Sequence, residues 1–154
     1  MTPLSLAGLL AMVTPQGQQE WWEVSGQVGI STVSGMDAQV SGTGVQVFAG
    51  ARKRSGWRPQ AGLQMHQAEG ARQWLIEAGA RRYFQPSGLP FEPFAEGGLN
   101  LPLLEPVGPG VRLGGGASYA VKDDIRIEGG LSHSVGLGDA VSVTFVSVGA
   151  AFRL

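Results

Sequence analysis

The sequence predicts an all-β protein that forms a closed, eight-stranded, antiparallel, up-and-down transmembrane β-barrel. One observation is composition: of 154 residues, 43% are hydrophobic and only 15% are charged, against ~25% charged residues in soluble domains. A second is that no apolar run reaches the roughly 18 residues that a transmembrane helix needs. The third is a period-two alternation of apolar and polar residues in eight segments joined by short turns. Such strands can turn one face to lipid and the other to a lumen.

The first residues hold an apolar run, Leu4–Val13, of the length expected for the core of a signal peptide. Residues 1–3 contain no Lys or Arg, and no clear pair of small residues marks a cleavage site. We therefore divide the chain into a signal-peptide-like or N-terminal segment, residues 1–19, and a barrel domain, residues 20–154. A short N-terminal helix or a plug inside the barrel is the alternative for the first segment.

The first three expected strands are Trp21–Ser31, Gln39–Arg52 and Trp57–Gln67. The third alternates most clearly, with Leu63 and Met65 on one side and Gln64 and His66 on the other. Alternation of this length is typical of a strand with one apolar and one polar face. The short turn Lys53–Gly56 joins the second strand to the third.

The next two expected strands are Arg72–Phe84 and Glu92–Leu101. They are separated by Gln85–Pro90, which contains two prolines and a glycine and is therefore predicted to break the strand pattern. In the fourth segment Trp74 and Ile76 alternate with Glu77 and Arg81, so the acidic and basic residues share one face.

The last three expected strands are Gly114–Val121, Ile125–His133 and Ala140–Leu154, with a polar turn at Lys122–Asp124. The final segment changes its alternation. Val143 and Phe145 share one parity, whereas Val146, Val148 and Phe152 share the other. A β-bulge near Phe145 would reconcile the two halves, because one extra residue turns every later side chain to the opposite face. The alternative is that the first half faces a packed interior.

Aromatic residues gather near the ends of the expected strands. They are Trp21, Trp22, Trp57, Trp74, Tyr83 and Phe84. This placement predicts an aromatic girdle at the level of the lipid headgroups.

The polar face of the strands predicts what fills the barrel. Eight strands enclose a lumen just wide enough to be filled by side chains, and charges inside it must be paired. We expect a network of Arg and Glu side chains that fills the lumen and fixes the register; gating of a very small conductance is the alternative role. The predicted members are Glu23, Arg58, Glu77, Arg81, Glu96, Arg126 and Glu128.

If both termini lie in the periplasm, the outer connections are about 32–38, 68–71, 102–110 and 134–139, all too short to favour an elaborate binding role. The basic segments Arg52–Arg54 and Arg81–Arg82 fall on the periplasmic side. We expect these cations to anchor the barrel at the headgroups.

Three motifs carry a family resemblance: Pro93–Asn100, the glycine-rich Gly114–Tyr119, and Ile125–Glu128 after a charged turn. Together they resemble the small eight-stranded outer-membrane β-barrel superfamily of Gram-negative bacteria. The resemblance implies a location in the bacterial outer membrane, contact with outer-membrane lipid and lipopolysaccharide, and a monomer. It also implies insertion by the barrel assembly machinery through the C-terminal strand. Because an eight-stranded barrel filled by side chains is not an open pore, we expect a structural or membrane-integrity role.

Some members of this superfamily remove acyl chains from lipid A with a histidine, a serine and a downstream acid. Ser132, His133, Ser134 and Asp139 occupy a similar region here, which makes a lipid A deacylase-like hydrolase an alternative. Adjacent residues of a strand point to opposite faces, however, so His133 cannot share a face with either serine. We therefore expect no catalytic residues.

Other classes of function are disfavoured by composition. The net charge is −1 without clusters of Lys and Arg, which gives no case for nucleic-acid binding. Cysteine is absent and the two histidines are far apart, so we expect neither a metal site nor a cofactor. The remaining rival is a soluble lipocalin-like barrel with an apolar ligand inside. It would turn inward the residues that a membrane barrel turns toward lipid, namely Val24, Val28, Leu63, Ile76 and Ile127.

Overall fold

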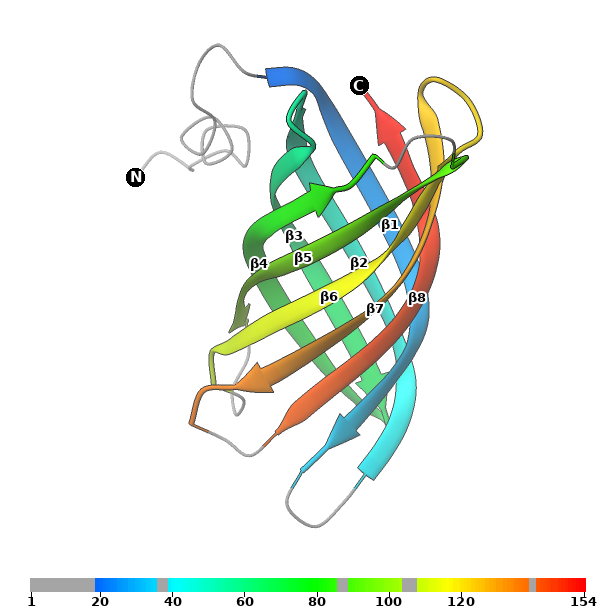
Figure 1. Cartoon of the computed structure of the whole chain (residues 1–154). Coiled ribbons are helices and arrows are strands. Elements are labelled where there is room, and N and C mark those ends of the chain that lie inside the picture. The colour runs from blue at the N-terminus through cyan, green and yellow to red at the C-terminus, as the bar shows by residue number, and fades with distance from the viewer. Residues whose placement is uncertain (1–18, 36–38, 86–88, 104–107, 139–140) are drawn as a thin grey trace.

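The computed structural model describes residues 19–35, 39–85, 89–103, 108–138 and 141–154, which form a single closed barrel (Figure 1). Its strands are β1 (Gln19–Ser34), β2 (Gln39–Lys53), β3 (Trp57–Ala68), β4 (Ala71–Tyr83), β5 (Phe91–Pro102), β6 (Gly110–Ala120), β7 (Ile125–Gly136) and β8 (Ser142–Arg153). Among these residues, no helix has the length and apolar character needed to span a membrane. The expected signal-peptide-like segment lies outside the described residues as far as residue 18.

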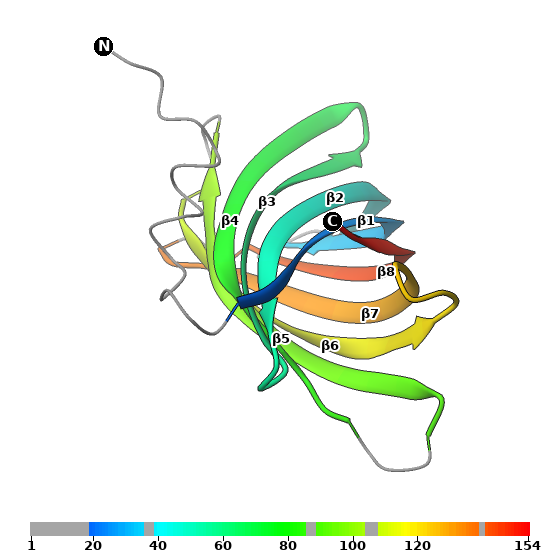
Figure 2. The same cartoon turned by 90° about the horizontal axis from the view of Figure 1, so that it is seen from above.

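Each strand pairs in antiparallel fashion with its neighbour in sequence, and β1 closes the barrel against β8. Val28 of β1, for example, lies opposite Val45 of β2 on one side and Val148 of β8 on the other. Closure leaves no strand edge free, which satisfies the backbone hydrogen bonds that lipid cannot satisfy. The predicted fold class is confirmed, and the view along the barrel shows the strands encircling one lumen (Figure 2).

The two faces of the sheet have opposite character. Val28, Leu63, Ile76 and Ile127 are each at least 40% exposed on the outside of the barrel, and Val24 is half-buried. The lumen instead holds most of the buried polar and charged side chains. This distribution is the reverse of a soluble ligand-binding barrel, so the lipocalin-like alternative is wrong. An apolar exterior around a polar interior is what a barrel surrounded by lipid requires.

Strand β8 shows no register shift against either β7 or β1, so the β-bulge considered near Phe145 is absent. Phe145 is only 2% exposed and faces the interior. There it packs edge-on against His66, with ring centroids 5.4 Å apart. The change of alternation therefore arises because an apolar side chain, Phe145, faces the packed interior of the barrel. This was the second interpretation of the sequence.

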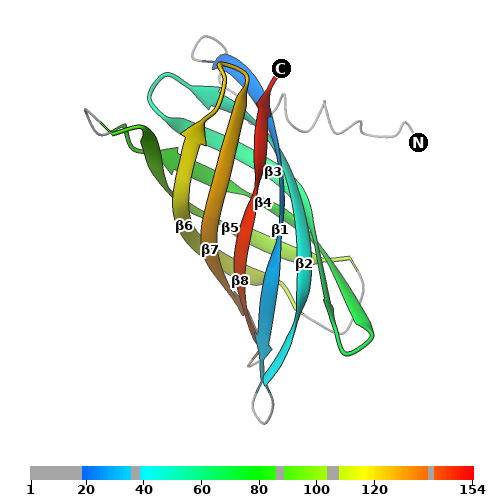
Figure 3. The same ribbon diagram turned by 90° about the vertical axis from the view of Figure 1, so that its right-hand side faces the viewer.

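Both ends of the strand series, the start of β1 and the finish of β8, lie at one end of the barrel (Figures 1 and 3). We call this the terminus end; it also carries the β2–β3, β4–β5 and β6–β7 connections. The opposite end, with the other four connections, is the loop end.

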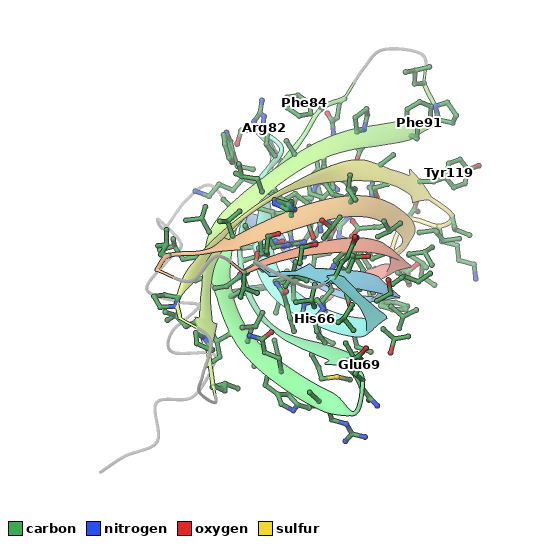
Figure 4. All side chains as sticks on the ribbon, turned by 90° about the horizontal axis from the view of Figure 1, so that it is seen from below. His66, Glu69, Arg82, Phe84, Phe91 and Tyr119 are labelled. Atoms are coloured by element: carbon green, nitrogen blue, oxygen red, sulfur yellow. The ribbon has the colours of Figure 1, made fainter. Side chains whose placement is uncertain are left out.

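The aromatic girdle is concentrated at the terminus end. Its exposed members there are Trp57, Phe84, Phe91, Tyr119 and Phe152, whereas Trp74 is exposed near the loop end. Figure 4 shows Phe84, Phe91 and Tyr119 projecting away from the barrel wall. Tyr83 is a correction to the sequence prediction: it is 1% exposed and points into the lumen, not toward the headgroups.

Candidate functional site

The centre of the lumen is organised around the hydroxyl of Tyr83. Tyr83 lies two residues after Arg81 on β4, so both side chains point to the same face of the strand, toward the lumen. The hydroxyl lies 3.0 Å from Glu128 Oε1 and 3.2 Å from Glu23 Oε1, and it accepts hydrogen bonds from Nη1 of Arg58 and of Arg81, each at 3.2 Å. It therefore connects side chains from four different strands.

Arg58 of β3 is fully buried and forms an ion pair with Glu23 of β1. Its Nη2 also donates to Ser25 Oγ at 2.8 Å. Strands β1 and β3 are not adjacent in the sheet, so this contact crosses the lumen instead of running along the wall. A buried guanidinium needs such a set of acceptors, because its desolvation otherwise costs several kcal/mol.

Arg81 joins two carboxylates, Glu96 on the neighbouring strand β5 and Glu128 across the lumen on β7. Its Nη1 lies 2.6 Å from Glu128 Oε2, while its Nε and Nη2 lie 2.9 and 2.8 Å from Glu96 Oε2. The Arg81 guanidinium also stacks on the ring of Phe94, 4.0 Å from its centroid. The planar fork of arginine suits both contacts, which lysine could not reproduce.

Arg112 of β6 extends the network toward the loop end. Its Nη1 lies 2.7 Å from Glu77 Oε1, and its Nη2 contacts Glu96 Oε1. Glu77 also accepts a hydrogen bond from Gln64, whose own oxygen lies 3.4 Å from Nε2 of His66. Glu96 thus receives both Arg81 and Arg112 and connects the centre of the lumen to this second cluster.

At the terminus end, Glu92 is shared by Arg52 and Arg126. Arg52 Nη2 lies 2.7 Å from Glu92 Oε2, and Arg126 also pairs with this oxygen while its Nε donates to Ser118 Oγ at 2.7 Å. The Arg52 guanidinium covers the Tyr83 ring at 3.9 Å from the centroid. Its Nη1 lies 3.9 Å from Glu23 Oε2, which links this cluster to the centre.

The lumen network therefore contains as many acidic as basic side chains, five of each, and its net charge is zero. The basic members are Arg52, Arg58, Arg81, Arg112 and Arg126, and the acidic members are Glu23, Glu77, Glu92, Glu96 and Glu128. The ion pairs and the Tyr83 hydroxyl join them into one connected set along the barrel. Chemically, this arrangement places charges that neutralise one another across the lumen.

The structure brings all seven predicted lumen residues into this network, with Arg126 at its partly exposed end. Sequence reasoning missed Arg52, Glu92, Arg112 and Tyr83. The expectation that Arg52 and Arg81 anchor at the headgroups is wrong, because both are almost completely buried inside. The alternation of side chains along β6 could have identified Arg112 as a lumen residue, because it lies between Val111 and Leu113, which face the outside.

The histidine of the hydrolase alternative and its two serines lie on opposite faces of β7. His133 is on the outside, where its Nδ1 lies 2.9 Å from Thr144 Oγ1. Ser132 is buried on the inner face, and Ser134 accepts a hydrogen bond from Asn100 Nδ2 at 3.0 Å. Asp139 lies outside the described residues. Within the part of the chain that is described, no group of three or more His, Asp or Glu side chains is placed to hold a metal ion.

Bacterial outer-membrane barrels are among the solved structures that share this fold. Neisserial surface protein A matches with a TM-score of 0.79 at 16% identity, covering 90% of this chain and 100% of that one. The N-terminal β-barrel domain of Pseudomonas aeruginosa OprF matches with a TM-score of 0.62 at 14% identity, covering 89% and 100%. Ail of Yersinia pestis matches with a TM-score of 0.60 at 13% identity, covering 88% and 100%.

The sequence itself matches no protein-family model, and a comparison with curated proteins finds no match. At these identities the structural likeness establishes a shared fold. The fold, with its apolar exterior, is that of small eight-stranded outer-membrane β-barrels.

Proposed function

We propose that this chain is a small outer-membrane β-barrel whose lumen is closed by side chains and whose role is structural, supporting membrane integrity. The observation that carries the proposal is the neutral Arg–Glu network across the lumen. A transport pathway needs space and partners that exchange, whereas here each of the ten charged groups has an oppositely charged partner inside the barrel.

Apolar side chains add to the filling of the lumen. Phe48, Phe94 and Phe145 are at most 5% exposed inside the barrel: Phe94 and Phe48 lie 4.0 and 5.4 Å from the guanidiniums of Arg81 and Arg112, and Phe145 packs on His66. Opening a path for ions would separate buried ion pairs, and each unpaired charge left behind costs about 3–5 kcal/mol. This energetic barrier favours a filled barrel over the gated conductance considered from the sequence.

The outer membrane is the location that the fold and the lipid-facing surface support. Lipid and lipopolysaccharide are then the molecules in contact with the exterior, and the barrel is a monomer within them. Insertion by the barrel assembly machinery, with β8 as the recognised strand, belongs to the same proposal. In support, β8 exposes Val146, Val148 and Phe152 on its lipid face.

The location is tested by fractionating cells that express the chain and by gel migration of the purified protein in detergent. A folded barrel is expected in the outer-membrane fraction, with a compact band that shifts when the sample is boiled. A chain that stays in solution without detergent and shows a single band at all temperatures would overturn the proposal.

The closed lumen is tested separately in planar lipid bilayers. The wild-type protein is expected to add no channel current above the bare membrane, whereas a variant with two network arginines removed, Arg81→Ala/Arg112→Ala, is expected to conduct. Channel activity of the wild type equal to that of the variant would contradict the filled-lumen role while leaving the outer-membrane location intact.

A further inference from the structure

The basic residue Arg82 lines a cavity at the terminus end. The cavity has a volume of about 460 Å³ and is lined by Ser55 and Gly56 of the β2–β3 turn, by residues 82–85 at the finish of β4, and by Pro93 of β5. Arg82 and Phe84 lie beside each other at the outside of the barrel (Figure 4). Neither side chain belongs to the lumen network.

Two contacts hold the Arg82 guanidinium in place at this cavity. Arg82 lies directly across from Trp57 in the β3–β4 pair, and its Cζ is 5.5 Å from the centroid of the Trp57 ring. Its Nη1 donates to the backbone carbonyl of Ser55. A guanidinium has five N–H donors, and no carboxylate among the described residues forms an ion pair with Arg82. Donors therefore remain for an external anion.

The backbone around Arg82 is fixed. Gly56 has a φ of 83°, and a Cβ at this position would come within 2.6 Å of the Tyr83 carbonyl oxygen, so only glycine fits. The Gly56 carbonyl accepts from the Tyr83 amide at 2.8 Å, and the Phe84 amide donates to the Pro93 carbonyl at 2.8 Å. The walls of the cavity are thus preformed.

The surroundings of the cavity indicate the kind of anion. Trp57 and Phe84 are exposed members of the aromatic girdle, which lies at the boundary between acyl chains and headgroups. Outside the lumen network, cations outnumber acids among the described side chains at the strand ends and turns of the terminus end. The cations are Lys53, Arg54, Arg82, Lys122 and Arg153, and the acids are Asp123 and Asp124.

We propose that Arg82 and the cavity beside it bind the phosphate of a glycerophospholipid in the leaflet that surrounds the terminus end. The inference rests on the proposed function, because it requires the barrel to stand in a membrane. Arginine matches phosphate oxygens with two parallel hydrogen bonds. Phe84 and Trp57 lie at the depth where the glycerol and the first acyl carbons of such a lipid would be, so the site serves one ordered lipid instead of a free anion.

The test is native mass spectrometry of the refolded full chain in detergent with dioleoyl phosphatidylglycerol as the probe. The wild type is expected to retain one lipid, and Arg82→Gln is expected to weaken this binding roughly tenfold or more, since a hydrogen bond to a charged group is lost. Arg82→Lys keeps the positive charge but lacks the paired N–H donors of the guanidinium. Its affinity for the lipid is expected to lie between those of the wild type and Arg82→Gln. The matched control is Lys122→Gln, at the same end but outside the cavity, which is expected to bind as the wild type does.

Two further probes identify the ligand. Dioleoylglycerol, which lacks the phosphate, is expected not to be retained, and inorganic phosphate is expected not to displace the phospholipid. Equal retention of the two lipids, or unchanged binding by folded Arg82→Gln, overturns the inference, and displacement by inorganic phosphate assigns the site to a free anion. Folding is read from the heat-dependent gel shift of the same samples, so failure of the barrel proposal is distinguished from failure of the lipid site.

Discussion

The hydroxyl of Tyr83 lies 3.0 Å from Oε1 of Glu128, although the two residues are 45 positions apart in the sequence. Tyr83 stands on β4 and Glu128 on β7, so the contact passes across the lumen. Because the same hydroxyl also meets Glu23, Arg58 and Arg81, it joins four buried charges that lie on β1, β3, β4 and β7.

The first prediction concerns this hydroxyl. Tyr83→Phe keeps the ring under Arg52 but removes hydrogen bonds from buried charged groups, so we expect a loss of about 1–3 kcal/mol in the free energy of unfolding. The measurement is reversible unfolding by urea in lipid vesicles, followed by tryptophan fluorescence. Tyr119→Phe is the matched control: Tyr119 is 50% exposed in the girdle, and its variant is expected to lie within about 0.5 kcal/mol of the wild type. Equal stabilities of the two variants would contradict the central role of Tyr83.

The second prediction concerns Arg112, which holds both Glu77 and Glu96. Arg112→Met leaves two buried carboxylates with fewer partners, and we expect it to cost about 3–5 kcal/mol. Adding Glu77→Gln removes one of these charges, so the double variant is expected to be more stable than Arg112→Met alone.

A double-mutant cycle in urea measures this coupling. Additive losses from the two substitutions would show that Arg112 and Glu77 do not interact, against the 2.7 Å contact between them. Arg72→Met, at the loop end and outside the lumen network, is the control and is expected to have little effect.

The third prediction compares two glutamines of β3 that both face the lumen. Gln64 donates to Glu77, whereas neither the nitrogen nor the oxygen of the Gln60 side chain has a hydrogen-bond partner among the described residues. Gln60 is 4% exposed. Replacing a buried polar group that has no partner with an apolar one of similar shape is neutral or stabilising. We therefore expect Gln60→Met to preserve or raise the urea midpoint and Gln64→Met to lower it.

The same experiment carries its own control, because the two variants make the same chemical change on the same strand. A lowered midpoint for both would mean that the Gln60 amide is satisfied in the folded barrel, and the predicted difference between the two sites would not hold.

Alternation along each strand was enough to predict which face of the strand is polar, and so the seven lumen residues could be named. Which of them meet could not be predicted, because contacts such as Arg58 with Glu23 join strands that are not neighbours and depend on the stagger of the closed sheet. Tyr83 shows how two rules can conflict. Its position near a strand end favoured the aromatic girdle, whereas its place in the alternation of β4 favoured the lumen. The side chain faces the lumen, as the alternation predicts.

Arg52 was missed for a related reason. It is followed by Lys53 and Arg54, and a run of three cations indicates a turn at the headgroups. The strand continues through Lys53, however, so the alternation still turns Arg52 inward to Glu92. Parity within an element outweighed local charge because the closed sheet fixes the direction of every side chain.

The last prediction concerns the outer face. Leu113 is 66% exposed on β6 and lies between the glycine-rich middle of the strand and its loop end. In lipid, Leu113→Arg would place a charge against acyl chains, which costs up to about 2–4 kcal/mol at the bilayer midplane and less toward the interfaces. Val121→Arg is the matched control, since Val121 is 50% exposed just beyond the finish of β6 at the terminus end and is expected to cost about 0–1 kcal/mol. Unfolding of both variants in lipid vesicles measures the difference. A charge tolerated equally at both positions would mean that the exposed apolar face meets water, and the membrane assignment of the exterior would fail.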